Sequence, residues 1–156
     1  MDYILQLRQY IGHRPILMVG ATVFVLDEGD HLLLLKRTDN LCWGVPGGAV
    51  ELGETVEDAA RRETREEMGL EIGEMTLFGV FSGPEMYYKY PNGDETYNIS
   101  IVFLTHDLRG TMDINPEEHS GFQYFPLDAL PENISPPLMP AIRKLMETYQ
   151  KPRDRR

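Results

Sequence analysis

The sequence predicts an α+β fold in which helices are layered on a mixed β-sheet, an α/β/α arrangement. Strand-like and helix-like stretches follow one another without regular strand-helix-strand alternation, which disfavours a doubly wound parallel sheet. The chain has 156 residues, 42% hydrophobic and 26% charged, as in an ordinary globular domain. Because no repeat, low-complexity segment or linker divides it, residues 1–156 are expected to form a single domain.

The first half of the chain is expected to contain a short helix, two strands and a longer helix. Apolar residues follow helical spacing over residues 2–10. The β-rich runs 16–26 and 31–36 come next, and the DEGD between them predicts a hairpin. Residues 43–50 are interrupted by Pro-Gly-Gly, which indicates a loop. The longer helix is expected over residues 55–69, between a Thr that starts a capping box and a Gly that ends the helix.

The second half is expected to be mostly strands, followed by a closing helix. Residues 71–81, 86–90 and 96–107 are strand-like, and the last two runs are joined by PNGD, a strong hairpin signal. After a long polar loop, residues 121–125 are expected to form a short strand. Helical spacing of apolar residues predicts the closing helix over residues 137–150.

The charge balance restricts the partners. The net charge is −10 and the pI about 4.8, whereas nonspecific nucleic-acid binders carry a basic face. An anionic substrate would therefore need local cations, such as a bound metal ion. The basic tail at residues 151–156 is interpreted as a solvated chain end.

Three features of the sequence predict a cytoplasmic protein. The apolar runs are strand-length and fall short of the roughly 20 residues of a membrane helix. The N-terminus MDYILQLRQY has no basic region before an apolar stretch and does not resemble a signal peptide. Cys42 is the single cysteine, which agrees with a reducing compartment.

Three carboxylates of the longer helix fall on the face that should pack inward. Glu66 and Glu67 follow Glu63 by three and four residues, so all three share one side of the helix. That side also carries the apolar residues Val56, Ala59 and Ala60. Like charges at these spacings cost about 0.2–0.5 kcal/mol per pair when exposed, and burial raises the cost.

A divalent cation explains this arrangement better than the alternatives. A solvated acidic face, or pairing of the acids with Arg62 and Arg65, leaves the apolar neighbours unexplained. Mg²⁺ prefers oxygen ligands and keeps several waters, so carboxylates on one rigid helix make an open site that also takes substrate phosphates.

Residues Gly48 to Leu70, GAVELGETVEDAARRETREEMGL, resemble the Nudix box. Eight positions of that pattern are matched in register: Gly48, Glu54, Arg62, Glu63, Glu66, Glu67, Gly69 and Leu70. The one departure is Thr64, which stands at an aliphatic position and is expected to alter packing only. LLLLKR, WGVPGG and YFPLDALP resemble flanking elements of the family, and the resemblance implies its α/β/α sandwich with a mixed sheet.

The resemblance also implies roles for these residues. Glu63, Glu66 and Glu67 would hold Mg²⁺ or Mn²⁺, with the Gly48 carbonyl as a further ligand. Arg62 would orient the carboxylates, and Glu54 would tie the loop to the helix.

The reaction that the resemblance implies is hydrolysis of a nucleoside diphosphate linked to another group, through a metal-activated water. Glu63 is the preferred general base. A base from a downstream loop is the alternative, with Glu117 and Glu118 as candidates, of which the spacing to YFPLDALP favours Glu118.

Residues outside the box are candidates for substrate binding. Tyr88 and Tyr90 alternate onto one face of the predicted hairpin and Tyr87 onto the other. One of them is a candidate platform for a nucleobase, although cross-strand aromatic pairing that stabilises the hairpin is the favoured explanation for any single tyrosine. Arg37 is either a phosphate contact or an exposed strand-end charge. His106 and His119 make no ligand spacing and are left without a role.

The leading hypothesis is a cytoplasmic, Mg²⁺- or Mn²⁺-dependent pyrophosphohydrolase for a nucleotide-type small molecule. A nucleotide sugar, ADP-ribose, a noncanonical nucleoside triphosphate and a dinucleoside polyphosphate all suit the box. No nucleic acid binding is expected beyond a capped RNA end, no membrane is expected, and the family suggests a homodimer. The alternative is a catalytically silent Nudix-like sensor or interaction domain, against which the intact Glu63, Glu66 and Glu67 argue.

Overall fold

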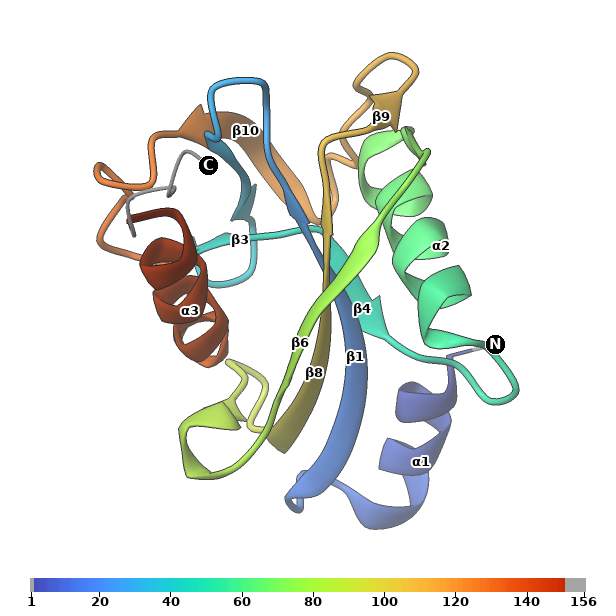
Figure 1. The fold of residues 1–156 in the computed structure, drawn as a ribbon. Helices are drawn as coiled ribbons and strands as arrows, with labels where there is room; N and C mark the ends of the chain where they lie inside the picture. Colours follow the sequence, from blue (N-terminus) through green and yellow to red (C-terminus); the bar gives the residue numbers. More distant parts are fainter. Residues whose placement is uncertain (1, 151–156) are drawn as a thin grey trace.

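The protein is described by a computed structural model over residues 2–150, which has an α+β fold with a mixed sheet and confirms the predicted class (Figure 1). The helices and strands, in chain order, are α1 (Tyr3–Ile11), β1 (Ile16–Val25), β2 (Leu32–Arg37), β3 (Trp43–Gly44), β4 (Gly47–Ala49), α2 (Val56–Met68), β5 (Glu71–Ile72), β6 (Thr76–Phe81), η1 (Pro84–Met86), β7 (Tyr87–Lys89), β8 (Glu95–Thr105), β9 (Leu108–Arg109), β10 (His119–Phe125), η2 (Pro136–Leu138) and α3 (Met139–Gln150).

The central sheet is built on the long strands β1 and β8. They run parallel and pair from Ile16 with Thr96 to Val25 with Thr105. The strand order is β4-β1-β8-β6, with β7 also paired to β8, and every pair except β1 with β8 is antiparallel. A smaller antiparallel sheet has the order β10-β2-β3.

Strands β1 and β2 separate two hydrophobic clusters. Leu33 and Leu35 of β2 face the cluster under α2, whereas Leu32 and Leu34 face the cluster under α3. All four leucines are fully buried, as expected of a strand covered on both faces. In Figure 1, α2 and α3 accordingly lie on opposite sides of the strands, and α1 lies below α2.

Helix α2 begins and ends where the sequence predicts. The Thr55 side chain caps its start by accepting a hydrogen bond from the Asp58 N–H at 3.1 Å. Gly69 ends it in the left-handed conformation, with a φ of 67°, which glycine adopts without steric cost. The fully buried Ala59 and Ala60 let this helix pack closely against the strands.

The predicted hairpin between residues 16–26 and 31–36 is wrong in its pairing. Only a single bridge, Leu26 with Leu32, joins the two strands, which then enter different sheets. The reason is that both edges of β1 are occupied, by β8 along its length and by β4 from Gly20 to Thr22.

Two further predicted elements are divided differently. The strand expected over residues 71–81 is broken into β5 and β6, which pair with β9 and β8 respectively. The loop expected within residues 43–50 contains β4, whose Gly47 and Gly48 pair with β1. A Cβ at Gly47 would lie 2.6 Å from the Ala21 carbonyl oxygen, so glycine allows this close backbone approach.

Three other expectations are confirmed. The leading helix, the hairpin of β7 and β8 around PNGD, and the closing helix all form close to the predicted bounds. The basic tail at residues 151–156 lies outside the described residues. Within residues 2–150, no helix is long and apolar enough to cross a membrane.

The buried Thr64 generates a stability prediction. Its hydroxyl donates to the Ala60 carbonyl at 2.8 Å, an oxygen that also accepts the helical N–H of Thr64. In T64V the buried hydroxyl is lost while that carbonyl stays paired, so we expect a change in the free energy of unfolding below about 1 kcal/mol. T64A also removes a buried methyl group, and we expect it to cost roughly 1–2 kcal/mol.

Urea unfolding of the wild type, T64V and T64A measures these changes. A T64V variant that is less stable than T64A would contradict the interpretation of Thr64 as a packing residue.

Candidate active site

A cavity of about 430 Å³ lies on one face of the central sheet. Paired positions of β1 and β8 form its floor, with Met18 beside Asn98 and Gly20 beside Ser100. Glu63 and Glu67 lie in its lining together with Gly47 and Gly48, and the rest of the lining mixes polar and apolar residues. A cavity that combines acidic groups with polar side chains suits a cation-bridged, polar ligand.

Glu67 is the most buried of the box carboxylates. It is 6% exposed, and its Oε2 accepts a hydrogen bond from the Gly47 N–H at 3.0 Å. Glu63 lies beside Gly48 so closely that a Cβ at Gly48 would be 2.5 Å from the Glu63 Cδ and Oε1. The glycine is therefore required for Glu63 to reach the cavity past strand β4.

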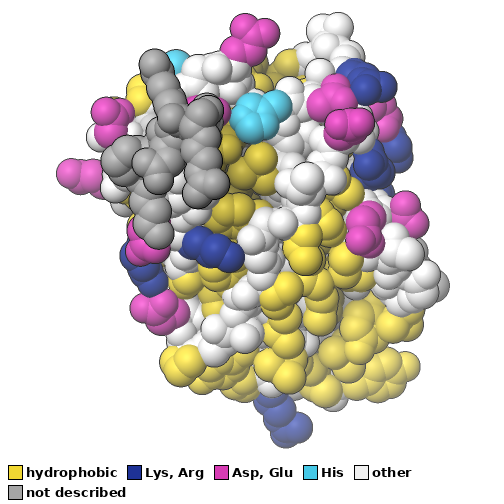
Figure 2. All heavy atoms as spheres, in the orientation of Figure 1, with side chains coloured by type: hydrophobic (Ala, Val, Ile, Leu, Met, Phe, Trp, Pro, Cys, Tyr) yellow, Lys and Arg dark blue, Asp and Glu magenta, His cyan; other side chains and the backbone are white. Residues whose placement is uncertain are grey.

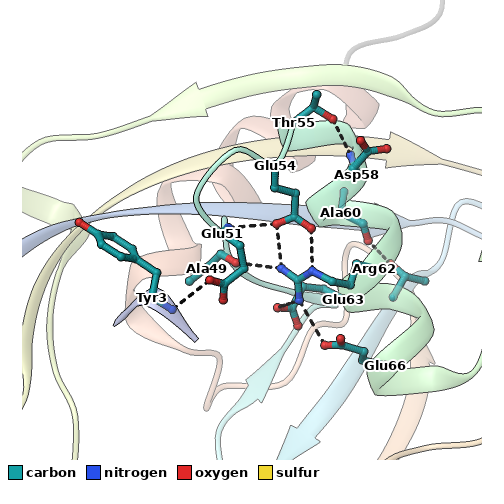
Figure 3. A network of polar contacts seen from close by, with 11 residues as sticks. Tyr3, Ala49, Glu51, Glu54, Thr55, Asp58, Ala60, Arg62, Glu63 and Glu66 are labelled. Carbon is teal, nitrogen blue, oxygen red and sulfur yellow. Dashed lines mark hydrogen bonds and ion pairs between the residues drawn. The ribbon is translucent and has the colours of Figure 1, made fainter. Parts of the chain in front are cut away.

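Arg62 connects the loop, strand β4 and helix α2 (Figure 3). Its Nε donates to Glu54 Oε1 at 2.7 Å and its Nη2 to Glu54 Oε2 at 3.0 Å, a bidentate pair. The same Nη2 donates to the Ala49 carbonyl at 3.1 Å, and Nη1 donates to Glu63 Oε1 at 2.8 Å. This network fixes the Glu63 carboxylate relative to β4.

Glu66 is separated from the two other box carboxylates. Its side chain is 59% exposed, and it accepts a hydrogen bond from Arg62 Nη1 at 3.2 Å. It is absent from the described lining of the cavity. The structure therefore brings Glu63 and Glu67 together and leaves Glu66 at the solvent side.

The loop before β10 brings Glu118 to the same end of the cavity. The Asp113 N–H donates to the Met68 carbonyl at 2.8 Å, and the Asn115 N–H donates to the Glu67 carbonyl at 2.9 Å. These bonds tie the loop to the end of α2. Glu118 lines the cavity, whereas Glu117 lies outside the described lining.

Burial and neighbouring charge shift the pKa values of these groups. Burial raises the pKa of Glu67 well above its usual range, and the Glu63 and Glu118 carboxylates raise it further. Burial also raises the pKa of Glu63, against the lowering effect of its hydrogen bond from Arg62. The pKa of Glu54 is lowered, chiefly by the hydrogen bonds from Arg62. Burial and then the charge of Arg37 lower the pKa of His119.

The donor set fits a hard divalent cation. Glu63, Glu67 and Glu118 offer carboxylate oxygens at one end of the cavity, where the charges of Glu63 and Glu118 raise the pKa of Glu67. Burying the Glu67 carboxylate beside these charges costs free energy unless a positive charge pairs with it. Mg²⁺ and Mn²⁺ prefer such oxygen ligands, and the Gly48 backbone lies beside them.

The aromatic candidates lie as the strand alternation predicts. Tyr88 and Tyr90 contact each other edge to face, with ring centroids 4.8 Å apart, and both line the cavity. Tyr87 packs on Tyr97 instead, away from that lining. Arg37 lines the cavity too, but its guanidinium is held by Asp39 through hydrogen bonds of 2.9 and 2.7 Å.

Two contributions were missed by sequence reasoning. Helix α1 supplies Ile4 and Arg8 to the cavity lining, and no spacing in the sequence indicates that this helix folds back there. His119, left without a role, lies near Glu67 and Glu118. Its position next to Glu118 in the sequence was the one available signal. Arg61, on the same helix, donates hydrogen bonds to the Ile72 and Gly73 carbonyls.

A mixed sheet flanked by helices, with helical carboxylates beside a glycine-rich strand, defines the class of MutT-like proteins. A crystal structure of a MutT NUDIX hydrolase from Burkholderia pseudomallei is 31% identical, with a TM-score of 0.68 over 85% of this chain and 97% of that one. A family model described as NUDIX domain matches residues 16–149. The chain therefore belongs to the Nudix family.

The curated relatives carry hydrolase names. An ADP-ribose pyrophosphatase from Methanocaldococcus jannaschii is 36% identical over 69% of this chain and 62% of its own length. An NAD-capped RNA hydrolase, NudC, from Edwardsiella ictaluri is 30% identical over 91% of this chain and 49% of its own length. The chain thus spans less than two thirds of the length of the first relative and about half the length of the second.

Gly48 generates a prediction about the carboxylate beside it. In G48A the new Cβ would collide with the end of a flexible side chain, Glu63, so the fold should persist while Glu63 is displaced. We expect a thermal unfolding midpoint within a few degrees of the wild type and metal affinity lowered about tenfold or more.

G53A is the matched control, since a Cβ at Gly53 meets no atom within 4 Å, although its φ of 77° makes a small loss of stability expected. Titration calorimetry with Mn²⁺ measures the affinity. Unchanged binding in G48A would show that the position of Glu63 does not matter to the metal.

Proposed function

We propose that the protein is a Mg²⁺- or Mn²⁺-dependent hydrolase of a nucleoside diphosphate linked to another group. The observation that carries this proposal is the convergence of Glu63, Glu67 and Glu118 at one end of a cavity large enough for a nucleotide portion. The names of the Nudix relatives support the same reaction class.

Each group of the chain has a task in this reaction. Glu63 and Glu67 would hold the metal with the Gly48 carbonyl, and Glu66, which is exposed on the same helix face, would be a further ligand. When bound, the metal lowers the pKa of water and neutralises charge on the phosphate oxygens. Arg62 keeps Glu63 in place through its hydrogen bond at 2.8 Å.

The proton of the attacking water is taken by a carboxylate at the same end of the cavity. Glu63 and Glu118 are the two candidates, because both line the cavity beside Glu67. Arg37 would approach a phosphate oxygen from the strand end, with Asp39 setting the direction of its guanidinium.

The group beyond the diphosphate would contact the remaining lining of the cavity. Tyr88 and Tyr90 offer an aromatic surface in that lining, and Asn98 and Ser100 offer hydrogen bonds from the floor. This lining suits a base or sugar better than an alkyl chain. ADP-ribose is the first substrate to test, because it is named in the Methanocaldococcus relative. An NAD-capped RNA end is the second, from the NudC name.

We also propose that the protein is cytoplasmic and forms a homodimer. A single cysteine supports a cytoplasmic protein. A homodimer is supported by apolar side chains that are exposed on the molecule, Leu17, Leu77 and Val80. Figure 2 shows that hydrophobic side chains gather on the molecular surface toward the lower part of the view. Light scattering that gives the mass of one chain would remove the dimer from the proposal.

The activity is tested with a panel of nucleotide derivatives. We expect the purified protein with Mg²⁺ or Mn²⁺ to release a nucleoside monophosphate or phosphate from at least one of ADP-ribose, nucleotide sugars, dinucleoside polyphosphates and noncanonical triphosphates. Chelation should abolish the release, and E67Q should lower kcat at least about 100-fold, because a buried ligand is lost.

No release from the whole panel, together with no effect of E67Q on ligand binding, would favour the alternative of a silent sensor domain. E57Q, at an exposed position in the first turn of α2, is the control for the charge change.

The aromatic surface generates a separate prediction. If the base or sugar stacks on Tyr90, Y90A should raise KM about tenfold and change kcat less, because stacking contributes about 1–3 kcal/mol. Y87A, on the other face of β7, should leave both constants near the wild-type values. Steady-state kinetics on the best substrate of the panel measures both variants. Equal effects of the two substitutions would mean that the hairpin acts through stability alone.

A further inference from the structure

A second cavity of about 310 Å³ adjoins the active-site cavity. Arg37, Glu67 and Glu118 line both cavities, so the Glu67 carboxylate lies in the wall that they share. His119 lines only the second one within the described residues. The buried Glu67 carboxylate is therefore also approached from the second cavity, where His119 lies.

His119 is placed as a ligand would be. The residue is 6% exposed, and its Nδ1 is buried and has no hydrogen-bond partner among residues 2–150. One ring nitrogen of His119 and one carboxylate oxygen each from Glu67 and Glu118 all lie within 4.8 Å of one another. Ligand atoms on a six-coordinate ion with bonds near 2.1 Å are about 3–4 Å apart. Small side-chain rotations would bring these three atoms to that spacing.

The backbone holds these side chains together before any ion binds. Asn115 accepts hydrogen bonds through its carbonyl from the N–H groups of Glu118 at 3.2 Å and His119 at 3.0 Å, while its own N–H binds the Glu67 carbonyl. The Thr38 N–H donates to the Glu118 carbonyl at 3.0 Å. The loop is thus fixed both to α2 and to the end of β2. A preorganised site of this kind binds an ion with little loss of conformational freedom.

A structural role explains the histidine less well. A buried imidazole that only fills space usually directs its ring nitrogens to hydrogen-bond partners, because an unpaired polar atom is costly. The positive charge of Arg37 nearby would oppose a cation, but Asp39 pairs with its guanidinium at both Nε and Nη2. Glu67 and Glu118 are therefore left to balance an added positive charge.

We propose that His119 is a nitrogen ligand of a metal site completed by Glu67 and Glu118, and that this site selects a first-row transition ion, such as Mn²⁺ or Co²⁺, over Mg²⁺. Imidazole is a good ligand for transition ions, whereas Mg²⁺ prefers oxygen ligands and keeps its waters. The inference rests on the proposed function only in taking Glu67 as a ligand.

The test measures binding without substrate. The metal-free full chain is loaded with one equivalent of Mn²⁺, and pulsed electron paramagnetic resonance is used to look for coupling to a nitrogen nucleus. We expect such coupling in the wild type and its loss in H119Q. By titration calorimetry, H119Q should lower the affinity for Mn²⁺ and Co²⁺ about 10–100-fold and that for Mg²⁺ less than about twofold.

The chain offers a control that leaves His119 intact. The other three histidines, His13, His31 and His106, have side chains that are 66%, 43% and 48% exposed. Replacing all three by glutamine should keep the nitrogen coupling, which assigns it to His119 even if H119Q does not fold. Mn²⁺ with oxygen ligands alone in the wild type would overturn the proposal, as would coupling that disappears in the triple variant.

The resonance and hydrolysis experiments together distinguish the His119 metal site from the proposed hydrolase function. Nitrogen coupling in a protein that hydrolyses nothing in the panel would leave the metal site standing and remove the hydrolase. Hydrolysis with Mn²⁺ bound only by oxygen would do the reverse.

Discussion

The site depends on the hydrogen bonds of one guanidinium. Arg62 binds both oxygens of Glu54, the Ala49 carbonyl and the Glu63 carboxylate, so it joins the loop before α2, strand β4 and the helix itself. Its planar fork of donors can satisfy acceptors in several directions at once, which a lysine cannot do. The pKa of Glu54 is lowered by this contact, and so the pair stays charged. The Glu63 carboxylate is held by this anchor, whereas the Glu67 carboxylate is held by the Gly47 N–H.

The strand beside Arg62 explains how the helix comes close enough. Strand β4 is three residues long and pairs with β1; its Gly47 allows the close approach to β1, and its Gly48 leaves the space that Glu63 occupies. Strand β8 pairs with one edge of β1 along its length and β4 takes the other edge from Gly20 to Thr22, while β2 joins a second sheet. In that sheet Arg37, at the end of β2, lies opposite His119, at the start of β10. This pairing brings β10 and its preceding loop to the carboxylates.

The sequence predicts those parts of the site that are set by local spacing. Helical periodicity places Glu63 and Glu67 on one face because both belong to the same helix, and strand alternation separates Tyr88 from Tyr87 in the same way. The hairpin of β7 and β8 is likewise local, since the Asn-Gly turn encodes it. Glu66 departs from the pattern because Arg62 draws its side chain toward solvent, and helix geometry fixes only the direction of the Cβ.

Contacts between distant segments could not be predicted in this way. His119 meets Glu67 because backbone hydrogen bonds tie the loop to the end of α2, and those bonds involve groups that every residue carries. Helix α1 reaches the cavity for a similar reason: the Arg8 Nη2 donates to the Glu95 carbonyl at 2.8 Å, and the Tyr3 N–H donates to Glu51. Neither contact produces a periodic pattern of residues from which it could be predicted.

The two sides of Glu67 are consequently different chemical environments. On the substrate side its neighbours are Glu63 and the Gly47 backbone, which offer oxygen atoms and one N–H group. In the second cavity the loop presents the His119 imidazole, while the Glu118 carboxylate lines both cavities. A cation bound at either cavity would offset the electrostatic cost of burying Glu67. The same buried carboxylate could then serve an oxygen-rich site and a nitrogen-containing one.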